Sequence, residues 1–389
     1  MVRAAIAGRV LERRRRAHAV RHSGRVSALD ALRKLRWTTV VPLAALAVLA
    51  PTWSTKPGGA VLAVVAVFLA AAVPAAVYHA EVIAHRVGEP FGSLVLAVAV
   101  TVIEVALIVT LMVSSDSDTS TLARDTVFAA VMLTSNAVVG LSLLAVTLRG
   151  RIATFNAEGT ATALATVLTL ATLSLVVPTF TTSRPGPEFS SEQLTFAALA
   201  SLVLYALFVF VQIVRHRDHF VEPDVTEPDT AEDDVPPSKR ETVGSLGLLL
   251  AALVAVVGLA KVESPAIEDA ADAIGAPQSA VGVMIAILVL APKAVAAVRN
   301  AARGRVQTSL NLAFGSAMAS IGLTIPAIAV ASIWLDGPLV LGLGSTQMVL
   351  LAVTAVVAAL TVLPCRATLQ EAGVHLVLAS AFVFLAVNP

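Results

Sequence analysis

Long apolar runs recur along this 389-residue chain, and they constrain its fold more than any other feature. Each run has roughly 17 to 25 residues, which as a helix would span the hydrocarbon core of a bilayer, about 30 Å thick. Strands that alternate polar and apolar residues are absent, so helices rather than a barrel must satisfy the backbone. The sequence therefore predicts an all-α polytopic membrane protein.

The composition supports this prediction, because the chain is 57% hydrophobic and only 14% charged, beyond what a soluble core of this size needs. We predict about eleven transmembrane helices, at residues 38–53, 60–79, 91–114, 125–148, 160–180, 193–214, 243–260, 279–298, 307–332, 338–361 and 372–388. The net charge of +1 gives no indication of a nucleic-acid partner.

The loop cations indicate the orientation. With the N-terminus in the cytoplasm, most loop cations fall inside, as the positive-inside rule requires. The inside set is Arg86, Arg149, Arg151, Arg215, Arg217, Lys239, Arg240, Arg299, Arg303, Arg305 and Arg366. The outside set is Lys56, Arg124, Arg184 and Lys261. The first residues are strongly basic and lack the apolar core of a signal peptide, so we interpret them as a cytoplasmic tail.

One long polar connection divides the chain into halves of five helices each. It is rich in acidic residues and proline, which is typical of a solvated linker. An odd number of helices per half places the halves in opposite orientations, the inverted repeat common in secondary transporters. The predicted organisation is a basic tail (1–37), an extra transmembrane helix (38–59), a first repeat (60–214), an acidic cytoplasmic linker (215–242) and a second repeat (243–389).

Two charged residues lie deep in predicted helices. Glu104 lies about 21 Å along the third span, and Lys293 lies about 21 Å along the eighth, so the two occupy matching depths in the two halves. A carboxylate at that depth is costly unless it faces a cavity, a partner or a bound cation. We predict that Glu104 binds cations or protons, as the metal-ligating carboxylate of the site, and that Lys293 lies opposite it.

Neighbouring residues could complete this site. Hydroxyl and amide side chains can coordinate a cation without adding charge, and small residues permit close approach of helices. Pro292 and Gly315 are predicted to break their helices near the site. The polar candidates are Thr134, Ser135, Asn136, Ser316 and Ser320.

A further group of polar residues, His79, Glu81, His85 and Glu89, lies near the cytoplasmic end of the second span. We favour Glu89 as a site residue, because it stands between two glycines at the start of the Glu104 helix. Phosphate-binding loops, nucleophile elbows and histidine-rich metal motifs are absent, so ATP-driven transport and hydrolysis lack support. We expect no enzyme activity and no cofactor.

Two segments resemble a known family. The runs "GEPFGSLVLAVAVTVIEVALIVTLM" and "VLAPKAVAAVRNAARGRVQTSLNLAFGSAMASIGLTIPA" are similar to the two repeat motifs of bacterial ChaA-type calcium/proton antiporters, within the cation/calcium exchanger superfamily. The resemblance implies a sodium/calcium exchanger-like fold of eleven helices in the bacterial inner membrane. It also implies alternating access, with membrane lipid, transported cations and protons as the partners.

The resemblance implies one central glutamate from each repeat. Glu104 matches the first, but Lys293 stands where the family has the second. One carboxylate beside an ammonium should bind calcium poorly. The chain is therefore expected to exchange protons for calcium, the family substrate, or for sodium or potassium through a Glu104–Lys293 ion pair. The third alternative is an exchanger-like membrane protein that has lost transport.

Overall fold

The computed structural model describes residues 37–55, 57–88, 91–114, 118–150, 152–223, 237–273, 275, 277–334 and 337–389. The predicted basic tail, except its last residue, lies outside the described residues. The central part of the predicted linker, 224–236, and Glu89 also lie outside them.

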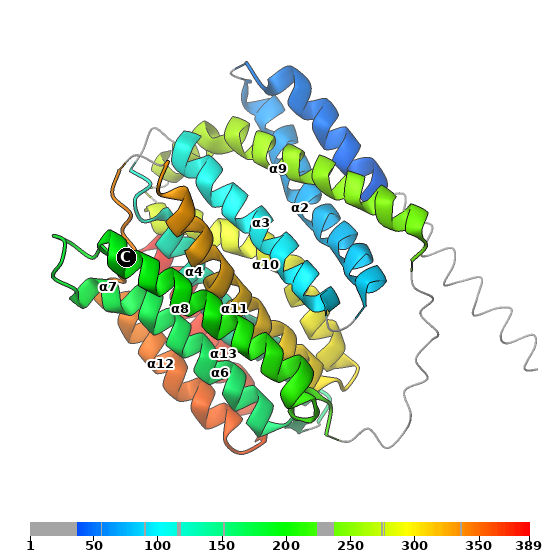
Figure 1. The fold of residues 1–389 in the computed structure, drawn as a ribbon, viewed down its shortest axis with the longest axis vertical. Coiled ribbons are helices and arrows are strands. Elements are labelled where there is room, and N and C mark those ends of the chain that lie inside the picture. Colours follow the sequence, from blue (N-terminus) through cyan, green and yellow to red (C-terminus); the bar gives the residue numbers. More distant parts are fainter. Residues whose placement is uncertain are drawn as a thin grey trace, which may run out of the picture.

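The described chain is a bundle of apolar helices joined by short connections (Figure 1). The first half contains the N-terminal helix Trp37–Thr52, α2 Gly59–Val87, α3 Phe91–Ser114, α4 Leu122–Met132 with η1 Leu133–Val138 and α5 Val139–Thr147, α6 Ala157–Ala171 with η2 Thr172–Val176 and α7 Val177–Phe180, and α8 Ser191–Phe210 with η3 Val211–Arg215. The second half contains α9 Lys239–Ala273, α10 Gln278–Ala302, α11 Val306–Ala331, α12 Ser345–Val362 and α13 Leu369–Val387.

The helices match the prediction of about eleven spans. Within the described residues, ten helical stretches are long and apolar enough to cross a membrane, and Trp37–Thr52 is a shorter apolar helix. The predicted start of the tenth span at residue 338 is wrong. Residues 337–344 are not helical, and the amides of Val340, Gly342 and Leu343 donate to the carbonyls of Ser120, Pro187 and Leu175 rather than to carbonyls of their own turn. Helix α12 therefore begins only at Ser345.

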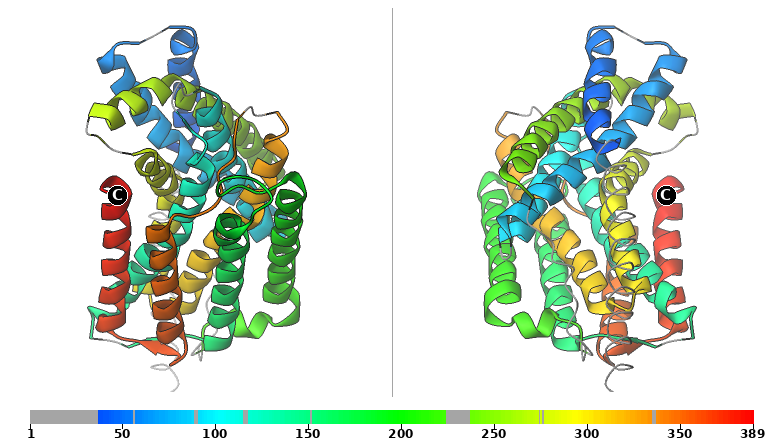
Figure 2. Two further views of the ribbon diagram at one scale, coloured as in Figure 1. Left: turned by 90° about the vertical axis from the view of Figure 1, so that its left-hand side faces the viewer. Right: turned by 90° about the vertical axis from the view of Figure 1, so that its right-hand side faces the viewer.

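The two halves pack on each other reciprocally. Helix α3 of the first half packs on α11, and its counterpart α10 packs on α4. Helix α8 packs on α11, and its counterpart α13 packs on α5. The first helices of the halves, α2 and α9, lie along one another (Figures 1 and 2). This exchange of partners is the arrangement expected of an inverted repeat.

The hydrophobic interior has two large clusters, and α10 lies between them. One cluster joins α10 to the N-terminal helix, α2, α3 and α9, and the other joins it to α4–α8 and α11–α13. Side chains on one side of α10 belong to the first cluster and those on the other side to the second. The first cluster contains Val281, Ile285 and Val289 of α10. The second cluster contains Val283, Ala286 and Leu290 of the same helix. The helix that carries Lys293 is thus held from both sides.

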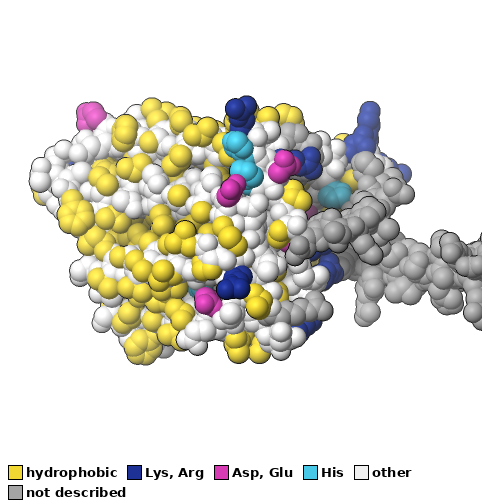
Figure 3. All heavy atoms as spheres, turned by 90° about the horizontal axis from the view of Figure 1, so that it is seen from below, with side chains coloured by type: hydrophobic (Ala, Val, Ile, Leu, Met, Phe, Trp, Pro, Cys, Tyr) yellow, Lys and Arg dark blue, Asp and Glu magenta, His cyan; other side chains and the backbone are white. Residues whose placement is uncertain are grey.

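Hydrophobic side chains also cover much of the outer surface. Large residues such as Phe196, Leu250 and Phe384 are more than half exposed. Figure 3 shows one face on which hydrophobic side chains gather and charged ones are few. Such a surface suits contact with lipid.

Two short strands, β1 Ala153–Thr154 and β2 Arg366–Ala367, pair antiparallel. The 3-10 turn η4, Arg217–Phe220, belongs to the predicted linker but is packed on the bundle. The Glu222 carboxylate accepts the backbone N–H groups of Gln307 (3.1 Å) and Thr308 (2.8 Å), and Asn311 donates to the Phe220 carbonyl (2.7 Å). We call this end of the molecule the linker end.

Gly282 allows α10 to approach α4. A Cβ added there would lie 2.9 Å from backbone and side-chain atoms of Asp125. We expect Gly282→Ala to lower the free energy of unfolding by about 1–3 kcal/mol through overpacking, measured as thermal unfolding in detergent. Gly315→Ala is the matched control, since nothing lies within 4 Å of an added Cβ there. Equal stability of the two variants would contradict this packing.

Candidate functional site

Glu104 lies in the middle of α3 and is only 4% exposed. Its carboxylate accepts a hydrogen bond from the Ser320 hydroxyl at 2.5 Å, and Thr324, one turn further along α11, lies next to it. A buried carboxylate is stable only where such partners replace water. The packing of α3 on α11 therefore supplies Glu104 with hydroxyl partners from the opposite half.

Lys293 lies on α10 and donates from Nζ to the Ser316 hydroxyl at 3.2 Å. Ser316 and Ser320 are four residues apart on α11, so they lie one above the other on one face of that helix. The charges of Lys293 and Glu104 act on each other across this pair of serines. Among the described residues the two form no direct ion pair. Four predicted site residues, Glu104, Lys293, Ser316 and Ser320, are thus brought together. The direct ion pair that one of the alternatives assumed is not present between Glu104 and Lys293.

A cavity of about 260 Å³ leads toward Lys293 from the linker end. Helices α2, α3, α8, α10 and α11 form its walls, with Thr308 and Gln212 near the linker end and Lys293 and Ser316 further inside. Glu104 does not line this cavity. Lys293 and Ser316 line this cavity, whereas Ser320, the partner of Glu104, lies one turn of α11 further from the linker end.

Glu81 lines the same cavity from α2, and its charge acts on Lys293. The sequence analysis named Glu81 but favoured Glu89, which lies outside the described residues. The second span was predicted to end at residue 79, whereas α2 continues to Val87. Glu81 is therefore part of a helix wall rather than of a loop. Glycine commonly ends helices, so Gly88 was the signal in the sequence that the helix continues past residue 79 and includes Glu81.

Three predicted polar residues, Thr134, Ser135 and Asn136, lie buried in the π-helical turn η1. Thr134 donates to the carbonyls of Ala130 (2.6 Å) and Val131 (3.1 Å). Asn136 contacts side chains of α12 and α13. These two side chains bond neither Glu104 nor Lys293, and a role of the three residues in cation binding stays a prediction.

The prediction that Pro292 and Gly315 break their helices is wrong. Helix α10 continues through Pro292 to Ala302, and α11 continues through Gly315 to Ala331. Packed membrane helices tolerate proline, because the surrounding structure can satisfy or shield the one carbonyl that loses its partner. Gly315 instead leaves open space, since it lines the cavity and an added Cβ would meet nothing within 4 Å.

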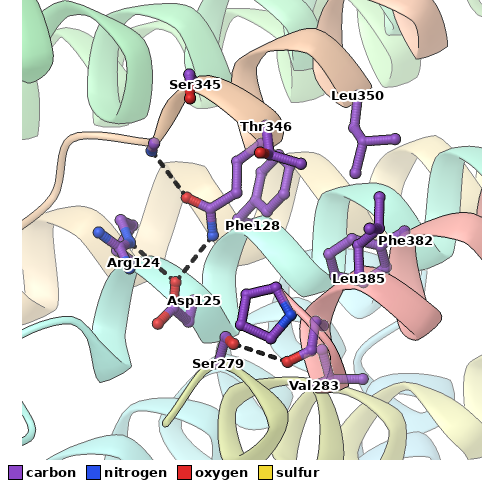
Figure 4. A pocket seen from close by; sticks show the side chains of 14 residues that line it. Arg124, Asp125, Phe128, Ser279, Val283, Ser345, Thr346, Leu350, Phe382 and Leu385 are labelled. Atoms are coloured by element: carbon purple, nitrogen blue, oxygen red, sulfur yellow. Dashed lines mark hydrogen bonds and ion pairs between the residues drawn. The ribbon is translucent and has the colours of Figure 1, made fainter. Parts of the chain in front are cut away.

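A second cavity, of about 290 Å³, is lined by residues of α4, α10, α12 and α13 (Figure 4). Its carboxylate, Asp125, accepts from Arg124 Nε (2.8 Å) and from Gln347 Nε2 (3.1 Å), and Ser279 donates to the Ala386 carbonyl. Arg124 thus balances the charge of Asp125. The hydrogen bond from Gln347 to Asp125 joins α12 to α4, and we interpret its role as structural.

Two reciprocally packed helical units that enclose a buried carboxylate within a membrane-spanning bundle are the arrangement of a secondary transporter. The chain belongs to the sodium/calcium exchanger protein family, whose model matches residues 58–214 and 244–388.

Curated relatives agree with this assignment. The chain is 41% identical over 356 residues to an ionic transporter, y4hA, of Sinorhizobium fredii (strain NBRC 101917 / NGR234), covering 91% of this chain and 96% of the relative. It is 33% identical over 314 residues to the sodium-potassium/proton antiporter ChaA of Escherichia coli (strain K12), covering 79% of this chain and 83% of the relative.

Solved structures share the fold. The structure of native YfkE matches with a TM-score of 0.69 at 15% identity, covering 90% of this chain and all of that chain. The crystal structure of the H+/Ca2+ exchanger CAX matches with a TM-score of 0.62 at 15% identity, covering 91% of this chain and 92% of that chain. At this identity the likeness concerns the fold alone. The expected exchanger-like fold is confirmed.

Proposed function

We propose that this protein exchanges a monovalent cation, sodium or potassium, for protons by alternating access, with Glu104 as the cation-binding carboxylate. One observation carries the proposal: the buried Glu104 has an ammonium, Lys293, as its charged neighbour across Ser316 and Ser320. A single carboxylate beside an ammonium presents no net charge to a cation.

Charge balance disfavours calcium at such a site. Calcium takes six to eight oxygen ligands and usually several carboxylates. At close range in a medium of low polarity, the repulsion between an ammonium and a divalent ion amounts to several kcal/mol. The described residues hold no cluster of three or more His, Cys, Asp or Glu side chains that could hold a metal ion. A monovalent ion needs fewer ligands and is repelled half as strongly.

Lys293 supplies the proton coupling in this proposal. A cation that reaches Glu104 places two positive charges beside one carboxylate, so the ammonium gives its proton to water in the cavity. When the cation leaves on the other side of the membrane, Lys293 takes up a proton there and neutralises Glu104 again. The hydroxyls of Ser316 and Ser320 can donate to Glu104 or accept from the Lys293 ammonium, and their oxygen lone pairs can also coordinate a cation.

The relatives support this choice. ChaA of Escherichia coli is named for sodium-potassium/proton antiport, and this chain is 33% identical to it. Calcium/proton exchange is the second candidate, and Glu81 favours it, since this carboxylate in the cavity wall could add the negative charge that a divalent ion needs. We also propose that the linker end faces the cytoplasm of a bacterial cell, because most loop cations lie on that side.

Proton transport in proteoliposomes tests the proposal. Purified protein is reconstituted with a pH-sensitive dye and a preformed proton gradient, and sodium, potassium or calcium chloride is added in turn. We expect sodium or potassium to collapse the gradient and calcium to do so only at much higher concentration. Preferential collapse by calcium would select the second candidate. No response to any of the three cations would leave the transport-inactive alternative.

Access from the linker end has its own test. Gly315→Leu fills space in the wall of the cavity, so we expect it to remove most of the maximal exchange rate while the melting temperature stays near that of Gly315→Ala. The measurement is the rate of dye recovery at saturating cation. An unchanged rate in Gly315→Leu would mean that cations do not pass through this cavity.

A further inference from the structure

His375 is a buried titratable side chain that the exchange cycle does not use. It lies on α13 and is 0% exposed. Its Nδ1 lies 3.2 Å from Asn136 Oδ1, and its Nε2 lies 3.1 Å from the Thr361 hydroxyl of α12. Histidine thus connects α12 and α13, the last two helices of the second half, to the π-helical turn η1 of the first half.

The chemistry of Asn136 determines where the His375 proton lies. The Asn136 amide nitrogen donates to the Met132 carbonyl (3.2 Å) and to the Thr354 hydroxyl (3.0 Å). A carbonyl only accepts hydrogen bonds, so the NH2 group must face Met132 and Oδ1 must face His375. Oδ1 is itself only an acceptor. His375 must therefore carry a hydrogen on Nδ1 to donate to Asn136, and the Thr361 hydroxyl can serve Nε2. The ring also contacts the backbone of Ser135, the residue before Asn136 in the same turn.

The contact between His375 and Asn136 stabilises the π-helical turn η1, which lies between α4 and α5. A π-helical turn interrupts the regular pattern of backbone hydrogen bonds. The Asn136 side-chain amide donates to the carbonyl of Met132, the residue before the turn. The turn and α5 pack against α10, which carries Lys293. Each partner in this chain of contacts is buried, namely His375, Asn136, Thr354 and Thr361. A lost partner would leave a buried polar group unpaired, and the turn would have to shift.

We propose that His375 is a positioning residue for cation exchange: it donates from Nδ1 to Asn136, holds the π-helical turn of the α4–α5 helix, and through that helix fixes α10 and Lys293. The effect on transport rests on the proposed antiport function. The hydrogen-bond assignment does not rest on it.

Two conservative variants separate the roles of the two ring nitrogens. Asparagine places its amide where Nδ1 lies, and glutamine places its amide where Nε2 lies. We expect His375→Asn to keep the half-saturating cation concentration within about twofold of wild type, whereas His375→Gln and His375→Ala raise it about tenfold, as supporting contacts of binding sites do. Asn136→Ala should raise it similarly, and the double variant Asn136→Ala/His375→Ala should add little, because both remove one interaction.

Ser174→Ala is the matched control. It removes another buried hydrogen bond between helices, that of Ser174 with Ser201 at 3.1 Å, far along the chain from η1. It should lower the melting temperature and leave the half-saturating concentration unchanged. A His375→Gln variant as good as wild type, or a His375→Asn variant as poor as His375→Ala, would overturn the proposal.

Nitrogen-15 NMR of histidine-labelled wild-type protein in detergent tests the assignment without any transport. The resonance that disappears in His375→Asn belongs to His375, and we expect its Nδ1 to carry a directly bonded hydrogen. An Nδ1 without hydrogen would overturn the proposal even if every variant transports normally. A wild-type protein that moves no cation yet shows the Nδ1 hydrogen would refute the antiport function and leave the positioning contact standing.

Discussion

Glu104→Gln is expected to abolish cation-driven proton movement, with a loss of roughly 100-fold or more in exchange rate at any cation concentration that can be tested. Removing one member of a buried charged group typically costs 2–5 kcal/mol in binding. Glutamine has the shape of glutamate and can still accept from Ser320, so the fold should survive. What is lost is the negative charge that attracts the cation.

The matched control for Glu104 is Glu263→Gln. Glu263 is also a buried carboxylate, on α9, but it lines none of the cavities described above. We expect this variant to exchange cations like wild type. If Glu104→Gln keeps wild-type exchange while it is folded, the site assignment is wrong.

Lys293→Glu is expected to change the preferred cation. The substitution turns a site of no net charge into one with two carboxylates, which suits a divalent ion. Calcium-driven proton movement should increase by roughly tenfold or more, in line with a change of several kcal/mol in electrostatic interaction. Exchange of sodium and potassium should decrease, because protons and divalent ions compete better than monovalent ions for two neighbouring carboxylates.

Lys261→Glu controls for the change in total charge. Lys261 is exposed on α9 and lies over the ring of Trp53, at 4.7 Å from the ring centroid, outside both cavities. It should leave the cation preference unchanged. A folded Lys293→Glu protein that prefers cations as wild type does would show that Lys293 does not set selectivity.

The backbone of this fold follows closely from apolar periodicity, because each helix must span the bilayer and satisfy its own backbone. The spans and the five-plus-five division follow from apolar runs of the expected length. Ser320 was a candidate for the site by its residue type, and its hydrogen bond to Glu104 is visible only in the structure. Helix ends were harder to predict. Glu81 was missed as a wall residue because α2 runs two turns past its apolar stretch.

Side-chain direction was the other part that could not be predicted. Asn136 has the chemistry of a cation ligand, but a π-helical turn rotates it toward His375 and Thr354. Such a turn depends on contacts with helices more than 200 residues away, which a local pattern cannot contain. Pro292 similarly indicated a break, yet packing on both sides keeps α10 continuous.

Proton release on cation binding tests the central claim most directly. Sodium or potassium chloride is added to purified wild-type protein, Lys293→Gln and Glu104→Gln in weakly buffered detergent solution, and the pH is recorded. The account predicts that the wild type releases protons and acidifies the solution, that Glu104→Gln releases none because it binds no cation, and that Lys293→Gln binds the cation without releasing protons. Release from Lys293→Gln equal to that of wild type would contradict the claim that Lys293 carries the exchanged proton.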